Sequence, residues 1–108
     1  MKKIALITGA TSGIGEACAR KFAEGGYNLI LTGRQADKLN MIQAQMEANR
    51  VEVKTLVFDV RDAEAAQQAM DSLPEPWKRI DVLINNAGLA LGLDKEYEGD
   101  PEDWNTMI

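Results

Sequence analysis

The chain has 108 residues, 45% of them hydrophobic and 27% charged, with a formal net charge of -5, a composition that is typical of one globular domain and excludes disorder. No stretch reaches the roughly 20 apolar residues of a membrane span, and the acidic balance argues against nucleic acid as a partner. We therefore expect a cytoplasmic protein that binds neither a membrane nor nucleic acid. One cysteine and no histidine exclude an intramolecular disulfide and predict no metal site.

Short apolar runs predict strands, and apolar residues at helical spacing predict helices. In chain order, the expected elements are a strand at Ile4–Ile7, a helix at Ile14–Ala23, a strand at Tyr27–Thr32, a helix from Gln35 to Asn49, a strand at Val51–Phe58, a helix after Asp62 that Pro74 ends, and a strand at Ile80–Ile84. Leu89–Gly99 shows no period and predicts a loop, before a helix that begins at Asp100 and Pro101.

Each predicted helix carries apolar residues that identify its buried face. These stripes are Ile14, Cys18 and Phe22 in the first helix, Leu39, Ile42 and Met46 in the second, and Ala66, Ala69, Met70 and Leu73 in the third. Its place on such a stripe favours Cys18 as a core residue over a reactive thiol.

Strands that alternate with helices form βαβ units, and right-handed crossovers between them give a parallel sheet with helices on both faces. We therefore predict an incomplete α/β sheet of Rossmann type, formed by the four strands. If the strand order is third, second, first, fourth, then Ile80–Ile84 lies at an open edge, which native proteins cover. We expect residues 1–108 to be a dinucleotide-binding unit, the N-terminal part of a longer single domain.

A glycine-rich turn, T-G-A-T-S-G-I-G at residues 8–15, connects the first strand to the first helix. Such a turn aims the free N–H groups of the helix, and the positive end of its dipole, at a bound anion such as a pyrophosphate. Gly9, Gly13 and Gly15 let the backbone turn sharply and approach phosphates closely, and the hydroxyls of Thr11 and Ser12 are further candidate donors. The alternative is a turn whose glycines serve packing alone; the strand before it and the helix after it favour a nucleotide.

The same stretch resembles the cofactor motif T-G-x-x-x-G-x-G of the classical short-chain dehydrogenases/reductases, and residues 85–88 resemble their N-N-A-G motif. Asp59 and Val60 match the pair that contacts the adenine in this family. The resemblance spans the whole chain and implies hydride transfer between a nicotinamide cofactor and an alcohol or carbonyl substrate. The cofactor-binding candidates are Gly9, Ala10, Thr11, Ser12, Gly13, Ile14, Gly15, Arg34, Gln35, Asp59, Val60, Asn86, Ala87 and Gly88.

Two adjacent asparagines of the second motif have different expected roles. Asn85 is expected to tie neighbouring strands by hydrogen bonds, while Asn86 is expected near the cofactor ribose. Ala87 and Gly88 are expected to leave room for the cofactor.

The end of the second predicted strand indicates which nicotinamide cofactor is used. Proteins that prefer NAD usually place an acidic residue about 20 residues beyond the glycine turn, where it binds the ribose 2′-hydroxyl. Here Gly33 stands in that place, and Arg34 follows with a guanidinium that can pair with a 2′-phosphate. NADP is therefore the predicted cofactor, with Gln35 in the same pocket; the alternative for Arg34 is a solvated residue at a helix start.

The proton-transfer residues of the family, a serine and a Tyr-x-x-x-Lys pair, are missing from this stretch. Tyr27 and Tyr97 are the two tyrosines, and Leu31 and Pro101 stand four residues after them. We therefore predict no catalytic residue in residues 1–108 and no turnover by them alone. The complete enzyme is expected to be a homo-oligomer.

A closer similarity, around Trp77 and residues 86–92, connects the chain to bacterial NADP-dependent dehydrogenases of serine and other 3-hydroxy acids. Trp77 and Trp104 are equally compatible with simple packing roles. The alternative function is a non-catalytic NADP-binding sensor or interaction module. A flavodoxin-like protein is a third option, which leaves the glycine turn and residues 85–88 unexplained.

Overall fold

The structure is a computed structural model that describes residues 2–59 and 61–86. In chain order its elements are β1 (Ile4–Thr8), α1 (Gly13–Glu24), β2 (Asn28–Gly33), α2 (Ala36–Glu47), β3 (Val53–Val57), α3 (Ala63–Asp71) and β4 (Val82–Asn85). The sequence predicted each of these elements, and the observed ends differ from the predicted ends by a few residues. The loop predicted at Leu89–Gly99 and the helix predicted from Asp100 lie outside the described residues.

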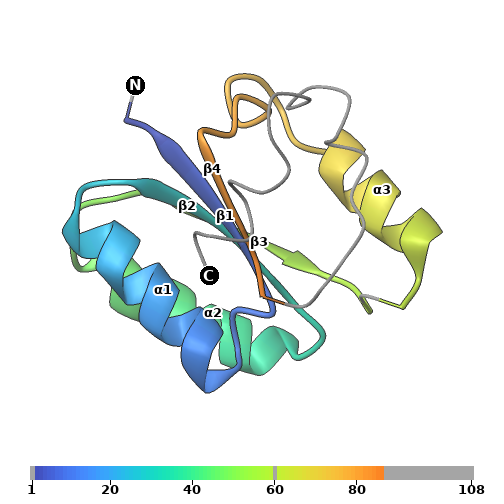
Figure 1. Cartoon of the computed structure of the whole chain (residues 1–108), viewed down its shortest axis with the longest axis horizontal. Helices are drawn as coiled ribbons and strands as arrows, with labels where there is room; N and C mark the ends of the chain where they lie inside the picture. Colours follow the sequence, from blue (N-terminus) through green and yellow to red (C-terminus); the bar gives the residue numbers. More distant parts are fainter. Residues whose placement is uncertain (1, 60, 87–108) are drawn as a thin grey trace.

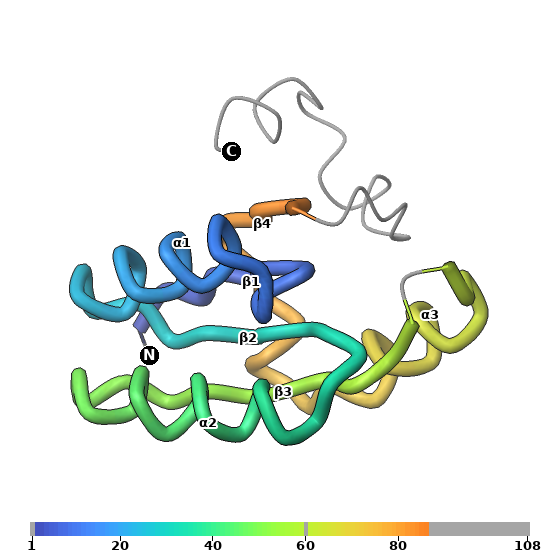
Figure 2. Tube along the Cα trace, turned by 90° about the horizontal axis from the view of Figure 1, so that it is seen from below, coloured from blue at the N-terminus to red at the C-terminus, as the bar shows by residue number. Residues whose placement is uncertain are grey.

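The four strands form one parallel sheet in the order β3-β2-β1-β4, which confirms the predicted fold class and strand order. Figure 2 shows the strands stacked in this order. The chain builds the sheet outward from β1 in one direction with β2 and β3, and then adds β4 on the other side of β1. Ligands of open α/β sheets bind at such a reversal, beside the carboxyl ends of the strands.

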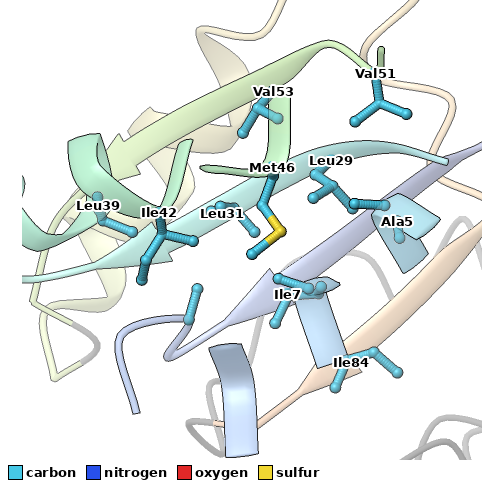
Figure 3. Close-up of a cluster of buried hydrophobic side chains, with 13 residues drawn as sticks. Ala5, Ile7, Leu29, Leu31, Leu39, Ile42, Met46, Val51, Val53 and Ile84 are labelled. Carbon is cyan, nitrogen blue, oxygen red and sulfur yellow. The ribbon is translucent and has the colours of Figure 1, made fainter. Parts of the chain in front are cut away.

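Helices cover both faces of the sheet, with α1 and α2 on one face and α3 on the other (Figure 1). The strands are apolar on both sides because both faces are buried: Ile4 and Leu6 of β1 join the cluster under α3, while Ala5 and Ile7 join the cluster under α1 and α2. Figure 3 shows the second cluster, in which Met46 of α2 lies against the strand side chains.

The buried stripes predicted for α2 and α3 are largely confirmed. Leu39, Ile42 and Met46 of α2 are buried. Ala66 and Met70 of α3, and Leu73 just after it, are also buried, while Ala69 is half-buried. Trp77 is 7% exposed and belongs to the same cluster as α3, so it is a packing residue. Asp62 caps α3 as predicted, because its carboxylate accepts from the N–H of Ala65 at 3.0 Å.

The buried face predicted for α1 is only partly confirmed, because Cys18 and Phe22 pack against the core cluster and Ile14 does not. Ile14 is 62% exposed, and Cys18 is only half-buried, whereas the buried residues of α1 are Gly15, Ala19 and Ala23. At the start of this face Gly15 lies against the backbone of Gly9 and Ala10, where a Cβ would overlap, and the small side chains of Ala19 and Ala23 continue the face into the core cluster. Phe22 still packs at the rim of this contact, edge to face with Tyr27 at 4.9 Å between ring centroids.

Among the described residues, β4 lies at the edge of the sheet and pairs with β1 alone. This agrees with the open edge that the sequence predicts for Ile80–Ile84. No helix in residues 2–59 and 61–86 is both long and apolar enough to cross a membrane.

Candidate cofactor-binding site

The carboxyl ends of β1 and β4 bring the glycine turn and the two asparagines of the second motif together. β1 ends at Thr8 and continues through residues 9–12 into α1, and β4 ends at Asn85 in register with Thr8. Because the two strands are parallel neighbours, Asn86 reaches the turn that follows β1. The sequence predicted the two motifs separately, and the sheet topology places Asn85 and Asn86 beside the glycine turn.

Ser12 is the centre of the hydrogen bonds that shape the turn. Its hydroxyl donates to the carbonyl oxygen of Gly9 at 3.0 Å and, as the N-cap of α1, accepts from the N–H of Gly15 at 3.1 Å. The side-chain amide of Asn86 donates to the same hydroxyl at 2.7 Å and to the carbonyl oxygen of Gly9 at 3.2 Å. In this arrangement the Ser12 hydroxyl proton is used inside the turn, which differs from its expected role as a donor to a phosphate.

The three glycines of the turn serve three different purposes. Gly9 has φ of 63°, a conformation that side chains disfavour. A Cβ at Gly15 would overlap the carbonyl oxygen of Gly9 and lie 2.9 Å from its carbonyl carbon, so Gly15 permits the close approach of α1 to the turn that follows β1. A Cβ at Gly13 would meet nothing within 4 Å, so neither packing nor φ requires a glycine there. The open space beside Gly13 leaves room for a bound group there.

The first turn of α1 presents free donors at this open side. The backbone N–H groups of Gly13 and Ile14 find no acceptor within the described part of the chain, whereas the N–H of Gly15 is capped by Ser12. Ile14 is exposed beside them. Free N–H groups at the positive end of a helix dipole bind anions, so this turn fits the pyrophosphate of a dinucleotide.

Other contacts hold the strand ends that carry the turn. The buried hydroxyl of Thr8 donates to the side-chain oxygen of Asn85 at 3.0 Å, and this contact gives Asn85 the strand-tying position that the sequence predicted. The N–H of Ala10 donates to the carbonyl oxygen of Thr32 at 3.0 Å, which fixes the turn to β2. Thr8 is part of the glycine-turn motif, but nothing in the sequence indicates that its partner is Asn85.

The ends of β2 and β3 form the second part of the site. Gly33 is buried, and a Cβ there would lie 3.3 Å from the Thr11 methyl group, so an acidic side chain would require Thr11 to move. Arg34 follows as an exposed residue, and Gln35 occupies the N-cap of α2 without a side-chain hydrogen bond. The N–H of Phe58 donates to the carbonyl oxygen of Gly33 at 3.0 Å, which brings Asp59 beside this end of β2.

Asp59 forms an ion pair with Arg61. The guanidinium donates to the Asp59 carboxylate at 3.2 and 2.8 Å, and the backbone N–H of Arg61 donates to it at 2.9 Å. Hydrogen bonds from the side chain of Arg61 first, and then from its backbone, lower the pKa of Asp59 from 3.8 to about 2. Burial opposes this shift, and the charges of Arg61 and, least of all, Arg34 add to it. Sequence reasoning missed Arg61.

The structure therefore gathers the predicted residues into two adjacent groups along one edge of the sheet. The glycine turn and Asn86 form the first group, and Arg34, Gln35 and Asp59 form the second. Val60, Ala87 and Gly88 lie outside the described residues.

Comparisons with known proteins identify the family. The family model described as short chain dehydrogenase matches residues 3–108. Sulfoacetaldehyde reductase 2 from Chromohalobacter salexigens is 50% identical over all of this chain and 42% of its own length. NADP-dependent 3-hydroxy acid dehydrogenase YdfG from Salmonella typhi is 48% identical over 97% of this chain and 41% of its own length. The chain belongs to the short-chain dehydrogenase family.

Solved structures agree with this assignment. The crystal structure of serine dehydrogenase from Escherichia coli is similar with a TM-score of 0.71 and 41% identity, over 97% of this chain and 47% of that one. The chain thus spans about two fifths of the length of the curated relatives it matches. The predicted resemblance to short-chain dehydrogenases, and to bacterial 3-hydroxy acid dehydrogenases within them, is confirmed.

The different purposes of two glycines give a first prediction. Gly15→Ala should lower the free energy of unfolding by about 1–3 kcal/mol, the usual range for overpacking, because its Cβ would overlap Gly9. Gly13→Ala is the matched control and should leave stability unchanged or raise it by up to about 1 kcal/mol, since alanine favours a helix. Chemical denaturation of both variants measures the difference; equal stabilities would contradict the proposed packing role of Gly15.

The Asp59–Arg61 pair gives a second prediction. Because the folded-state pKa is lowered, the pair contributes to stability above the ordinary value of 3.8 and loses that contribution as the pH falls through about 2. Arg61→Ala should raise the pKa of Asp59 toward 3.8, and the backbone N–H that remains should keep it somewhat below. Carbon-13 NMR titration of the Asp59 carboxyl measures this, with Arg79→Ala as a control. An unchanged midpoint in Arg61→Ala would show that the ion pair is absent in solution.

Proposed function

We propose that this chain is the NADP-binding part of an oxidoreductase that transfers hydride between the nicotinamide and an alcohol or carbonyl substrate. The observation that carries the proposal is the glycine turn, where the N–H groups of Gly13 and Ile14 have no acceptor among the described residues and the space beside the Gly13 Cα is open. Family membership supports the reaction class. When bound, the nicotinamide supplies or accepts the hydride, and the residues described here bind and orient it.

Each group of residues has a proposed part in binding. The N–H groups at the start of α1 bind the pyrophosphate, and Gly13 lets it approach. Asn86, whose amide already holds the turn, lies beside the ribose, and Asp59 accepts from the adenine amino group. The hydroxyl of Ser12 acts through the turn that it shapes, because its hydrogen bonds are made within the protein.

The residues at the end of β2 favour NADP over NAD as the cofactor. The acidic residue that would accept from a 2′-hydroxyl is absent at Gly33, and the place is too tight for one unless Thr11 moves. Arg34 is exposed and forms no ion pair with any described residue, so its guanidinium is available for a 2′-phosphate. The relative from Salmonella typhi is named NADP-dependent, which supports the predicted cofactor.

The names of the relatives support a substrate class. In a 3-hydroxy acid, and in sulfoacetaldehyde, the reacting carbon is joined through a single carbon atom to an acidic group, a carboxylate in one and a sulfonate in the other. We propose a small β-hydroxy acid, or the matching β-oxo acid, as the substrate of the complete enzyme, with serine among the carboxylate candidates.

We propose that the residues that transfer the proton during the reaction lie in the rest of the longer protein. No Tyr-x-x-x-Lys motif is present in these 108 residues. A non-catalytic NADP-binding module remains the alternative, and nothing in the comparisons favours it. A homo-oligomeric assembly and a cytoplasmic location stay predictions from the sequence.

Two substitutions in the complete protein separate the parts of the cofactor site. Arg34→Ala should weaken NADPH binding by about 10- to 150-fold, the range for hydrogen bonds to charged groups, and leave NADH binding nearly unchanged. Gly13→Ala should weaken the binding of both cofactors, because the pyrophosphate is common to them. Calorimetric titration of each variant with each cofactor measures these changes. If Arg34→Ala weakened both cofactors equally, the argument for NADP would fail.

The substrate proposal is tested by turnover. The complete protein, supplied with NADPH, should reduce sulfoacetaldehyde or small β-oxo acids, and with NADP⁺ it should oxidise serine or other small β-hydroxy acids. Neutral alcohols of the same length, such as 1-propanol, are the matched controls. Absorbance of the reduced nicotinamide follows the reaction, and a preference for the neutral alcohols would contradict the proposed acid group.

A further inference from the structure

The ends of β2 and β3 bring together two cationic side chains and one anionic side chain. Arg34 follows the end of β2, while Asp59 and Arg61 follow β3. The hydrogen bond from the N–H of Phe58 to the carbonyl oxygen of Gly33, at 3.0 Å, joins the residues directly before Asp59 and Arg34. One carboxylate therefore lies where either of two guanidinium groups is a possible partner.

Arg61 takes that carboxylate. Its side chain donates from two nitrogens, one to each carboxylate oxygen at 3.2 and 2.8 Å, and its backbone N–H adds a third hydrogen bond at 2.9 Å. Because Arg61 is only two residues from Asp59, little chain entropy is lost in forming this pair. The N–H of Asp62, which donates to the carbonyl oxygen of Asp59 at 2.9 Å, fixes the same turn.

Arg34 is left without an anionic partner. It forms no ion pair with a residue of the described ranges, and its side chain lies at an exposed position. Its charge nevertheless acts on Asp59, since it contributes to the lowered pKa of that carboxyl. Arg34 and Asp59 are thus close enough to interact and are not paired.

We propose that Arg61 is a positioning residue for cofactor specificity: by holding the Asp59 carboxylate, it prevents Asp59 from pairing with Arg34 and keeps the Arg34 guanidinium free for the 2′-phosphate of NADP. This inference rests on the proposed NADP binding. It answers a physical problem, because a carboxylate beside a phosphate site both repels the phosphate and competes for its cation. Asp59, although paired with Arg61, can still accept a hydrogen bond from the adenine, since a carboxylate has more acceptor sites than the three that Arg61 occupies.

The test is the ratio of NADH to NADPH dissociation constants of the complete protein, measured by calorimetric titration. Arg61→Ala should lower this ratio by about 2- to 5-fold, the effect of diverting Arg34 into an exposed ion pair. Adding Asp59→Asn to Arg61→Ala should restore the ratio of the wild type, because the amide does not pair with Arg34. Both cofactors carry the same adenine, so a weaker hydrogen bond between residue 59 and this base cancels in the ratio.

Control variants separate this effect from simple charge and from folding. Arg79→Ala also removes an exposed arginine of an ion pair, with Glu75 at 3.9 Å, and should leave the ratio unchanged. In the Asp59→Asn variant, the asparagine side chain can still accept a hydrogen bond from the backbone N–H of residue 61, so the turn after residue 59 is kept. Thermal unfolding checks the fold of each variant.

The outcomes distinguish this inference from the function on which it rests. Absence of NADPH preference in the wild type would overturn the proposed NADP binding and this inference with it. A preference that Arg61→Ala leaves intact would overturn the inference alone. A preference lowered by Arg61→Ala and not restored by Asp59→Asn would show that Arg61 contacts the 2′-phosphate directly, which would also overturn it.

Discussion

The close approach of α1 to the turn that follows β1 is the constraint on which the candidate site depends. Gly15 lies against the backbone of Gly9 and Ala10, where a Cβ would overlap the Gly9 carbonyl. This contact holds the start of α1 against the turn that follows β1, and the N–H groups of Gly13 and Ile14 in the first turn of the helix have no acceptor among the described residues. It also explains why the buried face of α1 consists of glycine and alanine.

A second constraint is the pairing of strands that are distant in the sequence. Thr8 and Asn85 are neighbours in register because β1 and β4 are parallel partners, and the adjacent Asn86 then bonds to Gly9 and Ser12. The turn after β1 is therefore shaped partly by the end of β4. Mutations that weaken the β1–β4 pairing are expected to disturb the turn without touching it.

Most of the fold could be predicted from the sequence because the strands are continuous apolar runs and α2 and α3 carry apolar stripes with helical spacing. The prediction failed at α1, where it chose the large residue Ile14 for the core. Close packing in α1 uses Gly15, Ala19 and Ala23, which the larger apolar residues of the same helix outweigh in a search for a hydrophobic stripe, and it leaves Ile14 exposed.

The sequence predicts those residues of the candidate site that belong to a motif. It does not predict the contacts that side chains make in the folded chain. The glycine turn, Arg34 and Asp59 follow from motif and spacing. The bonds of Ser12 inside the turn, and the pair formed by Arg61, depend on where side chains meet in space. Exposed charged residues two apart occur throughout proteins, so the sequence alone does not distinguish Arg61 from a solvated arginine.

The bonds of Asn86 also bear on how the protein is made. Its amide reaches acceptors that lie 77 and 74 positions earlier in the chain. While the polypeptide is still being synthesised, the turn after β1 emerges from the ribosome well before Asn86 does, and it lacks these two hydrogen bonds during that interval. The turn after β1 in a nascent chain therefore gains its full set of hydrogen bonds only after β4 has been translated and docked.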